Sequence, residues 1–186
     1  MNSQLEAEGF KFEFAKDMID CIVFDSERHH VPQSHLNPVD IIAEFPDEYV
    51  FIELKKFKDG KIQFKCPLGE KTKVYTDCPL NKNQQASAAA SVKRIAHDLK
   101  EKYYHTFIHR YAEGKLEKKV RYICLTEGLM KGEIVRLQQL LESQMPLKKL
   151  SNDVFVKPII AGLAVVDSAL WNQNKYLSRY GQCTTV

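Results

Sequence analysis

The chain has 186 residues, of which 44% are hydrophobic, so it is long enough and apolar enough to form one domain with a genuine core. Its formal net charge of +3, from 27 basic and 24 acidic residues, is too small to mark the whole chain as nucleic-acid-binding, so any polyanion site must be local. The five cysteines are odd in number and form no CxxC pair, which argues against a zinc knuckle or a closed disulfide framework and favours free thiols in a reducing cytoplasm.

The N-terminal segment is predicted to contain a helix. Its polar and acidic start, MNSQLEAEGFKFEF, is not typical of a secretory signal, and no apolar run in the chain approaches the ~20 residues that span a bilayer. Between Phe10 and Asp25, apolar residues recur every three or four positions, which is the spacing of an amphipathic helix that packs on a sheet. The polar segment 26–38 contains two prolines and is predicted to be a loop.

Two β-rich runs, Val39–Phe45 and Tyr49–Phe57, predict a hairpin. They are separated by Pro46-Asp47-Glu48, whose proline and aspartate are typical turn formers. Apolar residues occupy both faces of the second run, as expected of a central strand that is covered on both sides. After a turn at Asp59-Gly60, the runs Lys61–Cys66 and Lys73–Thr76 are also predicted to be strands.

The rest of the chain predicts alternating helices and strands. The elements are a long helix over Asn83–Glu113 closed by Gly114, a buried strand over Val120–Thr126, a helix over Glu133–Met145, and a strand over Val154–Val166 bent at Pro158 or Gly162. The polar tail beyond Asn172 is expected to be mobile. The whole order, helix, strands, long helix, strand, helix and strand, predicts a single α/β domain over 1–186 with helices on both sides of a mixed sheet.

Three charged residues of the hairpin carry the chemistry. Asp40 opens the first strand, and Glu53 and Lys55 lie two apart in the second, where side chains share a face. A tight hairpin brings Asp40 near Glu53, and charges on a doubly covered strand need partners or a metal. The alternative is that Glu53 and Lys55 are solvated residues of a half-buried strand.

The carboxylate pair predicts a site for a divalent cation. Two ionised carboxylates repel each other, and a cation that prefers oxygen ligands, such as Mg²⁺, removes the repulsion. The ion would lower the pKa of a coordinated water and screen a phosphodiester, while the Lys55 ammonium stabilises the transition state or orients the nucleophile.

The segments Pro38-Val39-Asp40 and Glu53-Leu54-Lys55, separated by twelve residues, resemble the motif of the PD-(D/E)XK nucleases. The common core of that family is αβββαβ, and the elements predicted from Phe10 to Thr126 follow a similar order. The resemblance implies a restriction-endonuclease-like fold with an extra C-terminal helix and strand. It also implies that Mg²⁺, or Mn²⁺ as a substitute, is bound by Asp40, Glu53 and the backbone carbonyl of Leu54, with Lys55 as the catalytic lysine.

The same resemblance implies two further site residues, Glu13 and Gln85. Members of the family often add an acidic residue from the first helix, for which Glu13 is the candidate and Asp17, one turn later, the alternative. Some members place a glutamine on the helix after the motif strand, which suggests Gln85. Both residues also have ordinary explanations, as an exposed helix carboxylate and as one of two adjacent helix-start glutamines.

The long helix carries basic residues that suit contact with nucleic-acid phosphates, namely Lys93, Arg94, His97, Lys100 and Lys102, although a solvated polar face also explains them. The leading interpretation is a Mg²⁺-dependent endo- or exonuclease acting on DNA. Cleavage of RNA and a catalytically silent nucleic-acid-binding or scaffolding protein of the same fold are the alternatives, and the intact Asp, Glu and Lys set favours the enzyme. A homodimer would suit double-strand cleavage, and delivery by a partner protein would suit the lack of an obvious recognition domain.

Overall fold

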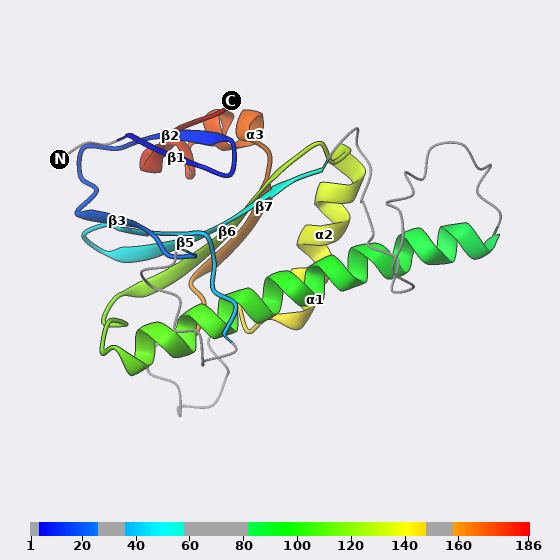
Figure 1. The fold of residues 1–186 in the computed structure, drawn as a ribbon, viewed down its shortest axis with the longest axis horizontal. Coiled ribbons are helices and arrows are strands. Elements are labelled where there is room, and N and C mark those ends of the chain that lie inside the picture. The colour runs from blue at the N-terminus through cyan, green and yellow to red at the C-terminus, as the bar shows by residue number, and fades with distance from the viewer. Residues whose placement is uncertain (1–3, 26–35, 58–81, 148–157) are drawn as a thin grey trace.

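Two β-sheets and three α-helices make up the described part of the chain, residues 4–25, 36–57, 82–147 and 158–186, in a computed structural model (Figure 1). The larger sheet has the strand order β3 (Asp20–Val23), β4 (Ile41–Glu44), β5 (Glu48–Lys56), β6 (Lys119–Glu127) and β7 (Gly162–Val166). The smaller sheet has the order β1 (Gln4–Ala7), β2 (Phe10–Phe14) and β8 (Gly181–Thr185). The helices are α1 (Lys82–Ala112), α2 (Lys131–Gln144) and α3 (Ser168–Gln173), and a 3₁₀ turn spans Ser178–Tyr180.

The elements form three layers (Figure 1). Helices α1 and α2 cover one face of the larger sheet, while the smaller sheet and α3 cover the other. Strands β3, β4 and β5 are antiparallel, and β6 and β7 continue the sheet in parallel. Because parallel neighbours require a crossover, α1 connects β5 to β6 and α2 connects β6 to β7. The chain is therefore an α/β protein with a mixed sheet, as predicted.

Strand β5 is the centre of the larger sheet, and its first seven residues are all buried. Tyr49 and Phe51 face the helices, whereas Val50, Ile52 and Leu54 face the smaller sheet. A strand with an apolar core on both sides must be apolar at nearly every position, since each buried large side chain stabilises the fold by ~1.5–3 kcal/mol. The predicted hairpin and the predicted central strand are both confirmed.

The predicted N-terminal helix is wrong, because this segment forms β2 and β3. Phe10, Phe12 and Phe14 alternate with two exposed polar residues and are all buried, which is the period of a strand. The helical spacing noted for Phe10 and Phe14 overlooked Phe12 between them. The strand also needs a partner, and β8, which pairs with β2, comes from the opposite end of the chain.

The tail beyond Asn172 is also unlike the prediction, since it is built into the fold. Tyr180 and Cys183 are 1% exposed, and β8 pairs along the full length of β2. The Asn172 side chain accepts a hydrogen bond from the Cys183 amide and donates one to the Cys183 carbonyl, at 2.9 and 2.7 Å. Gly181 has φ +123°, and an added Cβ would lie 2.1 Å from the Glu13 carbonyl oxygen, so only glycine lets β8 begin so close to β2.

The predictions for the middle of the chain are confirmed with shifted ends. Helix α1, strand β6 and helix α2 match the predicted elements within a few residues. Of the strand predicted over Val154–Val166, residues 154–157 lie outside the described residues, 158–161 are not in a strand, and β7 covers Gly162–Val166. The predicted strands Lys61–Cys66 and Lys73–Thr76, and most of the predicted loop 26–38, lie outside the described residues.

Two negative findings concern only the described residues. None of their helices has the length and apolar character required to cross a bilayer. Their three cysteines, Cys21, Cys124 and Cys183, are free thiols.

Candidate active site

Asp40 and Glu53 are brought together by the antiparallel pairing of β4 and β5. Ile41 of β4 is the pairing partner of Ile52 of β5. Because the two strands are antiparallel, the residue before Ile41, Asp40, lies opposite the residue after Ile52, Glu53. Asp40 is 8% exposed and Glu53 is not exposed at all. The hairpin therefore holds two buried carboxylates side by side on the face of the sheet that α1 covers, as the sequence predicted.

The two oxygens of the Glu53 carboxylate have different surroundings. Oε1 lies 2.7 Å from the ammonium of Lys55 and 2.9 Å from that of Lys102, in ionic contacts. Both oxygens are buried, and neither has a hydrogen-bond partner among the residues that the structure describes, so Oε1 has only these ionic contacts. Buried charged oxygens without hydrogen-bond partners are costly, so this carboxylate suits a ligand that supplies further contacts.

Burial raises the pKa of Glu53 to about 7, and the neighbouring Asp40 carboxylate adds to the rise. The ammonium groups of Lys102 and Lys55 oppose it. Burial therefore favours the neutral form of Glu53 more than water does, and added positive charge favours the carboxylate.

Lys102 of α1 is a member of this site that the sequence placed only among the basic residues of the helix. Its ammonium lies 2.9 Å from Glu53 Oε1, 3.5 Å from Asp40 Oδ1 and 3.9 Å from Asp25 Oδ2, and the residue is 8% exposed. Burial alone would lower the pKa of Lys102, but the Glu53 and Asp40 carboxylates outweigh burial and raise it, so the group is a cation.

A sequence signal for Lys102 did exist. It lies three positions after Leu99 and four before Thr106, both of which are buried on the inner side of α1. Residues at this spacing share one helical face, so a lysine within this stripe must either extend into water or meet a buried acid.

Asp40 is oriented by the backbone of β5. Its Oδ2 accepts a hydrogen bond of 2.6 Å from the amide of Leu54. Because the N–H and C=O of a strand residue point to the same side, the Leu54 carbonyl also faces the Asp40 side of β5. Its role as a metal ligand stays a prediction.

Helix α1 fixes the segment that leads into Asp40. The hydroxyl of Thr106 accepts a hydrogen bond of 2.8 Å from the amide of Val39 and donates one of 2.8 Å to the carbonyl of Lys102. His105 Nδ1 accepts another, of 3.0 Å, from the amide of Asn37. The same turn of α1 thus supplies the Lys102 ammonium and positions the residue before Asp40.

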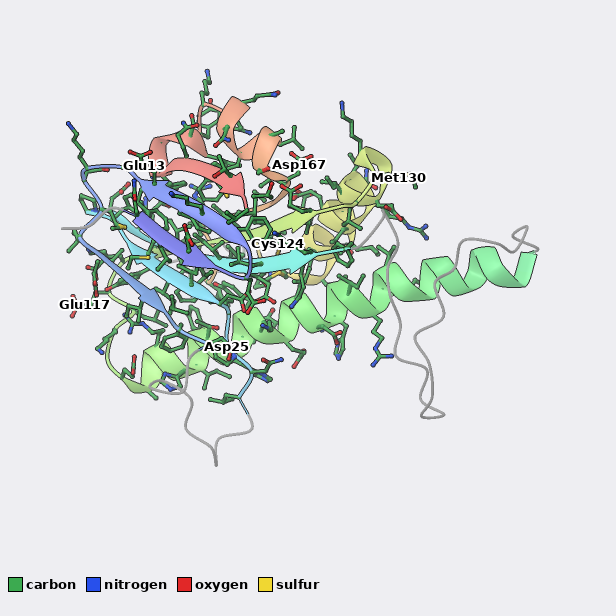
Figure 2. The ribbon with its side chains drawn as sticks, turned by 45° about the horizontal axis from the view of Figure 1, so that its top comes forward. Glu13, Asp25, Glu117, Cys124, Met130 and Asp167 are labelled. Atoms are coloured by element: carbon green, nitrogen blue, oxygen red, sulfur yellow. The ribbon has the colours of Figure 1, made fainter. Side chains whose placement is uncertain are left out.

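Glu13 is not brought to the site, and its predicted place on a helix is wrong. It lies on β2, exposed between the buried Phe12 and Phe14, so its side chain is on the outer face of the smaller sheet. Figure 2 shows Glu13 and Asp25 in different layers, Glu13 with the smaller sheet and Asp25 near α1. The alternative, Asp17, is exposed in the turn after β2.

Gln85 lies in the first turn of α1, seventeen residues before Lys102. At 1.5 Å per residue, this spacing places its backbone ~25 Å along the helix from the site. The start of α1 projects beyond the sheet (Figure 1), so the prediction that Gln85 joins the carboxylates is wrong. Its side chain is outside the described part of the structure.

The donor set fits a magnesium ion. Mg²⁺ is commonly held by one or two carboxylates, with waters and substrate phosphate completing the shell. Asp40 and Glu53 supply the carboxylates, and the Glu53 oxygens have no hydrogen-bond partner among the described residues. The described residues contain no group of three or more acidic, histidine or cysteine side chains arranged for a metal, so the site would depend on this pair.

No family model, no curated protein and no solved structure matches this chain.

Proposed function

We propose that this protein is a Mg²⁺-dependent nuclease that hydrolyses phosphodiester bonds in DNA, with Asp40 and Glu53 as metal ligands and Lys55 as the catalytic lysine. The observation that carries the proposal is the fully buried Glu53 carboxylate, opposite Asp40 and in ionic contact with Lys55, whose oxygens have no hydrogen-bond partner among the described residues. The resemblance to the PD-(D/E)XK motif supports it, and so does the succession β3, β4, β5, α1 and β6. The predicted leading helix of that core is replaced by β1 and β2.

The charges of the site favour a metal-loaded enzyme over a phosphate-binding surface. Three carboxylates, of Asp25, Asp40 and Glu53, surround only two ammonium groups, of Lys55 and Lys102. The fully ionised set therefore has a net negative charge and repels a phosphodiester. A divalent cation reverses the sign, so metal and anionic substrate suit the site together.

Each residue then has a defined task. Mg²⁺, when bound, would lower the pKa of a coordinated water and screen the phosphate charge. Asp40, held by the Leu54 amide, and Glu53 fix the position of the ion. Lys55 is more exposed than Asp40 and Glu53, with 38% of its side chain accessible, so its ammonium can contact the scissile phosphate or orient the attacking water.

A second candidate is a protein of the same fold that binds nucleic acid without cleaving it. The observation in its favour is that Lys102 already gives the two carboxylates a counter-charge, which a protein without a metal would need. Cleavage of RNA is a further variant of the first proposal, since a site built on phosphate chemistry carries no recognition of the sugar.

The test is incubation of purified protein with labelled single-stranded, duplex and branched DNA and with RNA, in Mg²⁺, Mn²⁺ or EDTA. Lys55→Ala should abolish cleavage. Lys56→Met is the matched control, because the ammonium of Lys56 points to the smaller sheet, where it donates to the carbonyls of Gly9 and Val186. It should cleave normally.

Metal-dependent cleavage of DNA that is lost in Lys55→Ala and retained in Lys56→Met supports the proposal. Cleavage that survives EDTA and the Lys55 substitution would contradict it. Tight binding with no cleavage of any substrate would favour the silent binding protein, and cleavage of RNA alone would change the substrate.

A further inference from the structure

Lys102 stands where a cation between Asp40 and Glu53 would stand. Its nitrogen lies 3.5 Å from an oxygen of Asp40 and 2.9 Å from an oxygen of Glu53. The side chain comes from α1, which packs on the sheet that contains the hairpin. The other lysine, Lys55, contacts only Glu53 among the described carboxylates. Lys102 is therefore the group that bridges the pair.

Asp40 offers a metal the same oxygen that the Lys102 ammonium contacts. Asp40 Oδ2 is already bonded to the amide of Leu54, which leaves Oδ1 as the oxygen that points away from the backbone. Oδ1 is the atom that Lys102 contacts. A divalent cation bound to Asp40 at Oδ1 would face the ammonium at short range, and the two positive charges repel each other strongly in a buried site.

A purely structural ion pair does not explain the arrangement. Glu48, at the start of the same strand, has both carboxylate oxygens in contact with partners: Oε1 with Arg179 and Tyr180, and Oε2 with Arg121. The closest contacts of both ammonium groups to Glu53 are at Oε1, and neither Glu53 oxygen has a hydrogen-bond partner among the described residues. The lysines thus balance the charge of Glu53 without satisfying its oxygens.

We propose that Lys102 is a built-in counter-ion that occupies the cation position of the Asp40–Glu53 pair and is displaced from it when a divalent metal binds. This inference rests on the proposed function, because it takes the same pair as the metal ligands. Lys102 acts as a positioning residue. It balances the charge of the two carboxylates while no metal is bound, and it competes with a metal for them. Substrate-free protein should therefore bind metal weakly.

The test is Mn²⁺ binding to the substrate-free protein, measured by titration calorimetry and by electron paramagnetic resonance of free Mn²⁺. Lys102→Met removes the competing charge and should tighten Mn²⁺ binding by about tenfold or more. Lys102→Arg keeps the charge and should not tighten it. Lys93→Met, at an exposed position of the same helix, controls for the loss of one positive charge and should leave the affinity within about twofold.

A second measurement uses the unmutated chain, in case Lys102→Met does not fold. The ¹⁵N and ¹H signals of the Lys102 ammonium should be protected from exchange without metal and should shift and lose protection on addition of Mg²⁺. Lys102→Arg, which lacks this signal, assigns it.

Tighter Mn²⁺ binding in Lys102→Met, or a Mg²⁺-dependent change of the Lys102 signal, supports the inference. Equal or weaker Mn²⁺ binding in folded Lys102→Met overturns it, as does a Lys102 signal that saturating Mg²⁺ leaves unchanged. If Mn²⁺ binds as expected but no nucleic acid is cleaved, the counter-ion role stands and the nuclease proposal fails. If the unmutated chain cleaves nucleic acid while Lys102→Met binds Mn²⁺ no better, the nuclease proposal stands and the counter-ion role fails.

Discussion

Glu48 and Glu53 lie five residues apart on β5, and both are almost completely buried, at 3% and 0% exposure. Glu48 faces the smaller sheet, where the Tyr180 hydroxyl and Arg179 contact one oxygen and Arg121 Nε lies 3.2 Å from the other. Glu53 faces α1, where two ammonium groups approach Oε1 and neither oxygen has a hydrogen-bond partner among the described residues. One strand thus carries a satisfied carboxylate and an unsatisfied one.

The comparison shows that burial of a charge does not by itself indicate a functional site. A buried glutamate whose oxygens are all paired joins elements together, as Glu48 joins β5 to the segment before β8. A buried glutamate that retains an open oxygen next to a second carboxylate keeps an unfavourable arrangement, which a binding site explains. Substitutions at the two positions should therefore have opposite consequences for activity and stability.

The largest effect is expected for Glu53→Gln on activity. Loss of the carboxylate removes a metal ligand at the reacting phosphate, so the cleavage rate should fall by about 10³-fold. Single-turnover assays at saturating Mg²⁺ measure this, with thermal unfolding showing that the protein is still folded. Activity within tenfold of the unmutated chain would remove Glu53 from the site.

Glu48→Gln should show the reverse behaviour. The network loses its buried carboxylate, which leaves Arg121 without that partner and Arg179 with only the exposed Asp47, so the free energy of unfolding should fall by about 2 kcal/mol. The cleavage rate of folded protein should not change. Urea denaturation measures the loss, and Glu44→Gln is the matched control, because its 2.6 Å ion pair with Lys118 is partly exposed and should cost below ~1 kcal/mol. An inactive but stable Glu48→Gln would contradict the distinction.

The pH dependence of stability tests the environment of Glu53 without an activity assay. The pKa of Glu53 is raised to about 7 by burial and by Asp40, from 4.5 in the unfolded chain. Between these pH values the folded state binds a proton that the unfolded state does not. The contribution of Glu53 to stability is therefore present below pH 4.5 and is lost as the pH rises toward 7.

Glu53→Gln, which stays neutral, should accordingly gain stability relative to the unmutated chain as the pH rises from 5 to 7, by at most about 1.4 kcal/mol per pH unit. The measurement is urea denaturation in metal-free buffer with EDTA. A constant difference between the two proteins across this range would show that Glu53 is ionised throughout.

The smallest effect is expected for Thr106→Val, which tests how Asp40 is held. The substitution leaves the buried amide of Val39 without its acceptor, so the free energy of unfolding should fall by about 1 kcal/mol. Asp40 should also be held less firmly, which lowers the cleavage rate by about tenfold. Thr106→Ser restores the hydroxyl and should recover most of the rate, and a failure to recover it would show that the lost methyl group matters instead.

The local part of the site could be predicted from the sequence. Asp40, Glu53 and Lys55 belong to one hairpin, whose turn residues and apolar runs are contiguous, so the antiparallel register follows from the chain itself. The long helix, β6 and α2 were also visible, because helical and strand periodicities are local properties. The class of fold followed from the order of these elements.

Contacts between distant segments were decided only by the tertiary structure. The pairing of β2 with β8 turned a predicted helix into a strand and a predicted mobile tail into part of a sheet, because a strand is stabilised by a partner that its own sequence does not specify. The position of Glu13 away from the site and the presence of Lys102 in it also depend on contacts between distant segments, which the sequence does not specify. Side-chain spacing within α1 marks Lys102 as facing inward, but only the packing of α1 on the sheet places its ammonium between Asp40 and Glu53.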